Sequence, residues 1–240
     1  KTQLIGGNIN TTTGIARWVL KNLEPTTELL IVEMDAYHPG EIAASCRITP
    51  PDISVLTSIG DQHLLRFGSQ KAITRGLAEV FTSLKPNGLR LCGSKTAAML
   101  GETGIAPDVR IVDEPTYRGV ALPCDHLSVS VKEDVAYAAA AADALDVPLR
   151  FVEDACRHFT PPDRRQKPAI VFGYAGIDDS YNISQATARA GVEAAKAMAR
   201  EAGKKLVVLT AGIPELPPGA DVQINTEYGA FLAQHADAVV

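Results

Sequence analysis

The chain lacks the features that mark most alternatives to a soluble globular protein. Its longest apolar runs fall well short of the ~20 residues that a membrane-spanning helix needs, and it opens without a charged-then-apolar leader. Lysine and arginine are scattered, and the net charge of -5 over 240 residues disfavours nucleic acid and anionic membranes as partners. We therefore expect a cytoplasmic protein that acts on small molecules.

Cysteine is scarce, and no two cysteines have CxxC spacing, which argues against a zinc site or a redox motif. The expectation is that all four are small buried hydrophobic residues in a reducing compartment: Cys46, Cys92, Cys124 and Cys156.

Three motifs are also missing from the sequence. It contains no GxxxxGK[ST] phosphate loop and no GxSxG nucleophile turn. The absence of GxGxxG weakens the hypothesis of a dehydrogenase-like nucleotide binder. No serine or cysteine motif accompanies the histidines at positions 38, 126, 158 and 235.

Short apolar runs alternate with amphipathic ones, which predicts an α/β fold. Runs at 29–32, 53–59 and 89–92 are typical of buried parallel strands. Between the last two, residues 70–85 place their apolar side chains on one face, which predicts a helix ended by Pro86-Asn87-Gly88. This order indicates helices layered on a parallel sheet.

The second half begins with an alanine-dense segment, 135–147, and a shorter one, 151–159, both predicted as helices. A proline-rich, charged linker follows at 160–168. The alternation then resumes, with an apolar run at 169–177, a helix at 183–203, a strand at 205–210 and a helix from about residue 226. We expect domains at 1–165 and 166–240, both incomplete, since a strand-like segment stands at each end of the chain.

Polar residues follow two of the predicted strands. Glu33 comes after 29–32, and Asp61 and His63 come after 53–59. Ligands bind beyond the carboxyl ends of strands in open α/β sheets, and a carboxylate with an imidazole suits Mg²⁺ or Mn²⁺. From spacing alone, polar residues at a solvated loop and a structural histidine are the more common explanation of such a pattern. Of the nearby carboxylates, Asp35 is expected to take no part, and Glu41 to start a helix after Pro39-Gly40.

Two loops are candidates for anion or nucleotide contacts. Residues 6–14, GGNINTTTG, are rich in glycine and hydroxyl groups, so their backbone N–H groups suit phosphate or carboxylate. Residues 178–182, DDSYN, stand between an apolar run and a helix. Asp179 or Ser180 there suits helix capping as well as nucleotide contact.

Taken in order, these motifs resemble the Mur ligases. GGNINTTTG, EMDAYHPGEI, TSIGDQHLLRFGS, DRR, IDDSYN and GIPELPPGADVQINTEYG follow the family's order from residue 6 onward. The resemblance is strongest to the branch that adds D-alanyl-D-alanine to UDP-MurNAc-tripeptide. It implies most of a P-loop-like, three-layer central ATPase domain without its P-loop strand and helix, followed by part of a Rossmann-like C-terminal domain.

The resemblance also implies site residues. Glu33 and His63 match metal ligands, and with Arg165, which matches an arginine that contacts nucleotide phosphate, they form the implied catalytic set. The implied nucleotide contacts add Asn8 and Asn10 of the first loop, the adenine-contacting position at Asp134, and the segment that faces ATP: Asp179, Tyr181 and Asn182. The implied cofactors are ATP and Mg²⁺, and the implied partners are nucleotide and peptide substrates.

Some positions depart from the family pattern. Leu77 stands where a carbamylated lysine is usual, Ser184-Gln185 replace Asn-Pro, and Asn225 replaces a histidine. Two hypotheses follow. The first is an ATP-dependent amide ligase that works through an acyl-phosphate, in peptidoglycan precursor synthesis. The second is a ligase-derived binding or scaffolding domain without catalysis.

Overall fold

The computed structural model describes residues 1–240 except 62, 106–107, 182, 215 and 217. It is a mixed α/β protein with parallel sheets, as predicted. The chain forms two compact units. The first consists of residues 1–59 and 66–112, and the second of residues 60–65 and 113–240.

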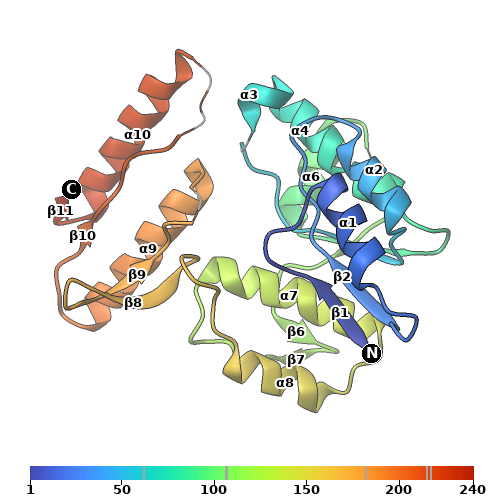
Figure 1. Ribbon diagram of the computed structural model, residues 1–240. Coiled ribbons are helices and arrows are strands. Elements are labelled where there is room, and N and C mark those ends of the chain that lie inside the picture. Colours follow the sequence, from blue (N-terminus) through green and yellow to red (C-terminus); the bar gives the residue numbers. More distant parts are fainter. Residues whose placement is uncertain (62, 106–107, 182, 215, 217) are drawn as a thin grey trace. The chain divides into compact units, whose positions relative to one another are not determined.

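The first unit contains two parallel sheets. β1 (Thr2–Ile5) pairs with β2 (Leu29–Val32), and α1 (Thr12–Asn22) connects them, so the two strands lie side by side (Figure 1). The second sheet has the order β3-β4-β5, from β3 (Ile53–Leu56), β4 (Leu89–Cys92) and β5 (Arg110–Ile111). The strands at 29–32 and 89–92 match the prediction, whereas β3 ends three residues early.

Helices complete the first unit: α2 (Glu41–Ile48), α4 (Gln70–Leu77), α5 (Glu79–Thr82) and α6 (Ser94–Glu102). A short helix, α3 (Leu64–Phe67), crosses the boundary between the units. The largest fully buried side chains include Ile5 of β1, Ile15 of α1, Leu91 of β4 and Phe81 of α5. The core therefore lies between the sheets and the helices that connect their strands.

The single helix predicted at 70–85 is wrong, because the structure divides it at Ala78. Side chains from two strands donate hydrogen bonds to carbonyl groups of α5. Ser54 Oγ donates to Val80 O at 3.0 Å, and Arg90 Nε donates to Phe81 O at 3.2 Å. These side chains bond carbonyl groups within α5, which ends at Thr82.

The second unit begins with an antiparallel hairpin of β6 (Thr116–Tyr117) and β7 (Val120–Ala121), followed by α7 (Val129–Ala144) and α8 (Leu149–His158). Tyr117, Cys124 and Cys156 belong to one buried cluster between these elements. All four cysteines of the chain are buried, as predicted, and they are not joined in disulfides.

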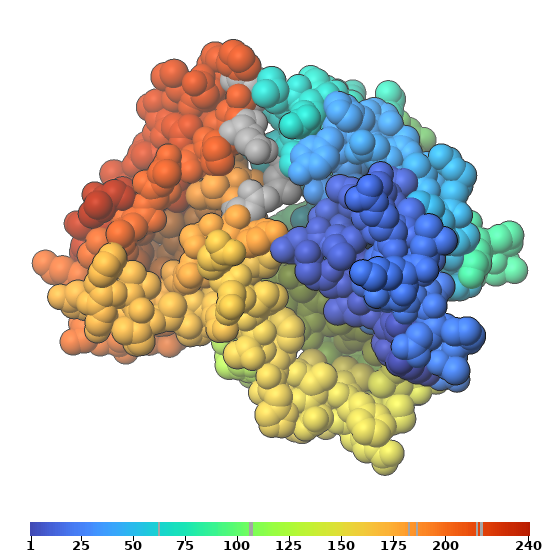
Figure 2. All heavy atoms as spheres, in the orientation of Figure 1, coloured from blue at the N-terminus to red at the C-terminus, as the bar shows by residue number. Residues whose placement is uncertain are grey.

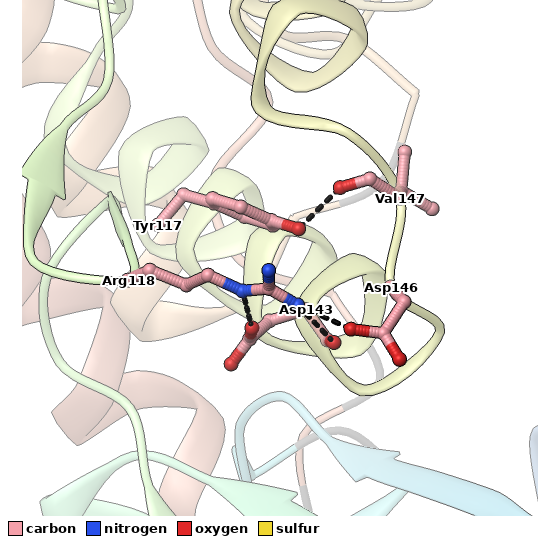
Figure 3. Close-up of polar contacts among 5 residues, drawn as sticks. All are labelled: Tyr117, Arg118, Asp143, Asp146 and Val147. Atoms are coloured by element: carbon pink, nitrogen blue, oxygen red, sulfur yellow. Dashed lines mark hydrogen bonds and ion pairs between the residues drawn. The ribbon is translucent and has the colours of Figure 1, made fainter.

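Figure 3 shows how the β6–β7 hairpin is fastened to the end of α7. The guanidinium of Arg118 donates from Nε to Asp143 Oδ1 at 2.6 Å and from Nη2 to Asp146 Oδ1 at 2.5 Å. Beside it, the Tyr117 hydroxyl donates to the carbonyl group of Val147. These bonds join a two-residue turn to the helix terminus.

Helix α7 begins six residues before its predicted start and ends three before its predicted end. Ser128 caps the first turn by accepting from Val131 N at 3.4 Å. At the other end, Asp146 has φ +52° and Val147 N donates to Ala142 O at 3.0 Å. This left-handed residue with a bond five positions back is a Schellman-type ending, which stops the helix.

The remaining elements are β8 (Lys167–Val171), β9 (Tyr174–Asp178), α9 (Gln185–Glu201), β10 (Val207–Val208), α10 (Ala220–His235) and β11 (Ala238–Val239). β10 and β11 pair in parallel, with α10 between them in sequence. A separate buried cluster contains Val192 of α9, Tyr228 and Leu232 of α10, and Leu206, the residue before β10.

The apolar run at 169–177 is an antiparallel hairpin, β8–β9, and not a single strand. Phe172 (φ +50°) and Gly173 (φ +84°) form its two-residue turn, and positive φ at both positions suits the right-handed twist of the paired strands. Figure 2 shows the segment around residues 163–175, coloured yellow to orange, at the surface of this face. Phe172 and Tyr174 are largely exposed there.

Helix α10 begins at Ala220, about six residues before its predicted start. Gly219 adopts φ +88°, and its N–H donates to Asp221 Oδ1 at 3.1 Å, so an acidic residue in the first turn fixes the helix start. Over the described part of the chain, no helix is long and apolar enough to cross a membrane.

Candidate functional site

The glycine-rich loop joins β1 to α1 in the first unit. Gly7 (φ +70°) and Asn8 (φ +59°) turn the chain, and Asn8 is exposed. Thr11 caps α1 by accepting from Gly14 N at 3.3 Å. A Cβ at Gly14 would lie 2.9 Å from Ile9 Cγ2, so this position requires glycine. The loop thus ends at a helix N-terminus, where backbone N–H groups favour anions.

Two predicted site residues meet beside this loop. Because Ile5 pairs with Val32, the carboxyl ends of β1 and β2 are neighbours, and Glu33 directly follows β2. Asn10 Nδ2 donates to Glu33 Oε1 at 3.4 Å, and Asp35 N donates to Asn10 O at 3.1 Å. Glu33 is exposed, so its carboxylate remains accessible to a cation.

The other two carboxylates of this segment have local roles, as expected. Asp35 Oδ1 accepts from Ala36 N at 2.8 Å. Glu41 is the first residue of α2, and its Oε2 accepts from the backbone N–H groups of Tyr37, at 2.7 Å, and His38, at 3.1 Å. Glu41 therefore fixes the turn before its own helix.

His63 lies in the second unit, in a turn just before α3, with φ +60°. Nearby, Leu64 N donates to Asp61 O at 3.2 Å, and Asp61 Oδ2 accepts from Gln185 Nε2 at 2.7 Å. No group of three or more metal-ligating side chains occurs among the described residues. The sequence predicts only two protein ligands, and their joint use by one cation stays a prediction.

Residues predicted to contact nucleotide gather around Arg165 in the second unit. Its guanidinium carbon lies 4.3 Å from the centre of the Tyr181 ring, and that of Arg164 lies 5.6 Å from it. Tyr181 N also donates to Arg164 O at 3.0 Å. Both arginines are exposed and the Tyr181 side chain is 37% exposed, so a cation and an aromatic face lie together at the surface.

Two carboxyl groups lie within electrostatic reach of Arg165. Desolvation raises the pKa of Asp179, against hydrogen bonds from Gln166 and the charge of Arg165, which lower it. The pKa of Asp134, on α7, is also raised, by desolvation and by Glu133, whereas Arg165 lowers it. Arg165 therefore lies within electrostatic range of a carboxyl group on α7 and of one in the segment after β9. Asn182, also predicted here, lies outside the described residues.

The capping hypothesis for the DDSYN segment is wrong. Helix α9 begins at Gln185 and is capped by Ser184, whose hydroxyl accepts from Thr187 N at 3.3 Å while Ser184 N donates to Thr187 Oγ1 at 2.8 Å. This reciprocal pair is a capping box. Asp179 instead lies close to two other residues. Its Oδ1 accepts from Gln166 N at 3.2 Å, and Gly191 is so near that an added Cβ there would lie 2.7 Å from Asp179 Oδ2.

Sequence reasoning missed Gln166 and Gly191, which both contact Asp179. Gln166 had no signal beyond its place after the two arginines. Gly191 interrupts a long helical pattern, and an isolated helical glycine often marks a close approach of another group.

The departures from the family pattern have structural roles. Leu77 is the half-buried last residue of α4. Gln185 bonds Asp61. Asn225 Oδ1 accepts from Ile213 N at 2.8 Å, and its Nδ2 donates to Ile213 O at 3.1 Å. Asn225 thereby fixes the loop before α10.

Together, the parallel α/β fold, the glycine-rich loop beside Glu33 and the group around Arg165 define a protein with candidate phosphate and nucleotide contacts. Residues 2–103 match the family model described as Mur ligase middle domain. Residues 2–103 are therefore similar to the middle domain of Mur ligases.

Individual relatives agree. The UDP-N-acetylmuramoyl-tripeptide--D-alanyl-D-alanine ligase of Mycobacterium bovis is 29% identical over 205 residues, which covers 74% of this chain and 40% of that protein. The ligase of the same name from Escherichia coli is 30% identical over 90 residues, covering 38% of this chain and 20% of that protein.

Solved structures share the fold. The MurF crystal structure from Acinetobacter baumannii has a TM-score of 0.78 at 23% identity, covering 99% of this chain and 56% of that one. MurF ligase from Thermotoga maritima, in complex with ADP, has a TM-score of 0.76 at 20% identity, covering 99% and 59%. The chain thus spans less than two thirds of the length of each of these relatives.

Proposed function

We propose that this chain is part of an ATP-dependent ligase that forms an amide bond in peptidoglycan precursor synthesis. In such a reaction ATP phosphorylates a carboxylate, and an amine attacks the acyl-phosphate and releases phosphate. The substrates would be a nucleotide and peptides, without nucleic acid or membrane, and the reaction would take place in the cytoplasm. The match of residues 2–103 to the Mur ligase middle domain and the similarity to UDP-N-acetylmuramoyl-tripeptide--D-alanyl-D-alanine ligases support this proposal.

The observation that carries the proposal is the group around Arg165. Arg165 of the linker lies over the Tyr181 ring, and its charge lowers the pKa of Asp134 on α7 and of Asp179 after β9, three segments that were predicted separately to contact nucleotide. An exposed guanidinium beside a partly exposed aromatic ring fits an anionic nucleotide, because one offers charge and the other a stacking surface.

The loop beside Glu33 supports a cation and phosphate site. An exposed carboxylate that is already oriented by Asn10 suits Mg²⁺, which prefers one or two carboxylates plus phosphate oxygens. We propose Glu33 and His63 as its ligands and Asn8 as a contact for substrate or phosphate. When bound, Mg²⁺ offsets phosphate charge and ATP supplies the phosphoryl group.

We also propose a domain boundary near residue 165, with residues 166–240 forming the partial C-terminal ligase domain. The separate buried clusters before and after this point support it, one around Cys124 and one around Val192.

The test is phosphate release from ATP. It should require both a muropeptide-like carboxylate and an amine, and it should collapse in Glu33→Ala and in His63→Ala. Activity that neither substitution changes would contradict the metal assignment. Nucleotide binding with no phosphate release under any substrate combination would favour the ligase-derived binding domain instead.

A further inference from the structure

Gln166 contacts two segments near Arg165, the start of α7 and the segment after β9. Its side-chain Oε1 accepts from Ser128 Oγ at 2.7 Å and from Ser130 Oγ at 3.1 Å, both at the start of α7. Its backbone N donates to Asp179 Oδ1 at 3.2 Å. One residue therefore binds α7 with its side chain and the segment after β9 with its main chain.

The backbone around Arg165 is strained on both sides. Arg164 has φ +60° and Gln166 has φ +51°, and residues other than glycine adopt this left-handed region at a cost. Such conformations persist only where surrounding contacts hold them. At Gln166 the two serine hydroxyls and the Asp179 carboxylate supply those contacts.

We propose that Gln166 is a positioning residue that sets the direction of the Arg165 side chain toward bound phosphate. This inference rests on the proposed function. The bonds to the serines fix Gln166, the left-handed turn then fixes the chain direction at Arg165, and Arg165 is held over the Tyr181 ring. Gln166 itself need not touch the nucleotide.

If Gln166 positions Arg165, substitution of Gln166 should lower the affinity for ATP and leave the affinity for adenosine unchanged. If Arg165 turns away, ATP loses a charge-assisted contact, whereas adenosine, which has no phosphate, loses nothing. A general loss of structure would weaken both ligands. The ratio of the two affinities therefore distinguishes positioning from stability.

The experiment measures dissociation constants for ATP and adenosine by calorimetry on the chain and its variants. Gln166→Met keeps the side-chain length and removes the acceptor, and we expect it to lower ATP affinity about tenfold with adenosine affinity unchanged. The matched control is Gln223→Met, a glutamine of α10 in the same unit that bonds Glu227, and it should change neither.

A double-mutant cycle tests whether Gln166 acts through its bonds to Ser128 and Ser130. With Ser128→Ala and Ser130→Ala already present, Gln166→Met should cause a smaller loss than it does alone, because its bonds to the serines are already gone and only its side-chain contact with Asp179 remains. An unchanged ATP-to-adenosine ratio in Gln166→Met, or an undiminished effect in the serine background, would overturn the proposal while leaving the proposed function intact. A wild-type chain that binds neither ligand would overturn both.

Discussion

The side-chain amide of Asn225 pairs with both backbone polar groups of Ile213, accepting from its N–H at 2.8 Å and donating to its carbonyl group at 3.1 Å. We expect Asn225→Ala to lower the free energy of unfolding by about 1–3 kcal/mol, since it leaves partly buried groups unbonded. Urea unfolding measures this. Thr226→Ala, which removes a single bond to Val222 O, is the control. Equal losses in the two variants would argue against a special role for Asn225.

Gly191 and Gly229 both lie inside long helices but differ in their surroundings. A Cβ at Gly191 would stand 2.7 Å from Asp179 Oδ2, whereas nothing lies within 4 Å of one at Gly229. We expect Gly229→Ala to stabilise the protein by up to about 1 kcal/mol through helix propensity. Gly191→Ala should forfeit that gain and displace Asp179. Melting temperatures that rise equally in both variants would contradict the close approach.

The two carboxylates bonded by Arg118 should contribute unequally. Asp143 is 19% exposed and Asp146 is 89% exposed, so solvent screens the second pair far more. We expect Asp143→Asn to lower the melting temperature more than Asp146→Asn, and added salt to weaken the effect of Asp146→Asn more than that of Asp143→Asn. A larger effect at Asp146 would show that the fork in Figure 3 does not hold in solution.

Asp179 and Asp163 should give opposite dependences of stability on pH. The pKa of Asp179 is raised by desolvation above its ordinary value of 3.8, so its contribution is fully present below that value and is lost as pH rises through the folded pKa. The pKa of Asp163 is lowered by its bond to Lys167, so its contribution is present above 3.8 and is lost as pH falls through its folded pKa.

Urea unfolding between about pH 3 and pH 7 checks these signs. Relative to Asp179→Asn, the wild type should lose stability as pH rises. Relative to Asp163→Asn, it should gain stability. Parallel curves for the two comparisons would refute the assigned environment of Asp179.

The sequence predicted parallel strands and the carboxylate that follows one of them, because these depend on local hydrophobic pattern and strand direction. It did not predict where α7 begins, since Ser128 is a cap that only the folded turn reveals. It also missed the break at Ala78, which divides the predicted helix into α4 and α5.

The candidate site was predictable to a similar extent. The motif order predicted Asp134, Arg165 and Asp179 as nucleotide contacts. Only the folded chain shows that both carboxyl groups lie within electrostatic range of Arg165. The role of Gln166 could not be predicted from the sequence, because its partners, Ser128 and Ser130, lie 36 to 38 residues away along the chain. Contacts of that range leave no local pattern.

The measurement that tests the central claim most directly compares ATP affinity in Arg165→Gln and Arg164→Gln. The two arginines are adjacent and both exposed, but Arg165 lies closer to the Tyr181 ring and acts on Asp134 and Asp179. We predict that Arg165→Gln weakens ATP binding at least about tenfold and that Arg164→Gln has a much smaller effect. Equal losses, or an unchanged affinity in Arg165→Gln, would contradict a nucleotide site built around Arg165.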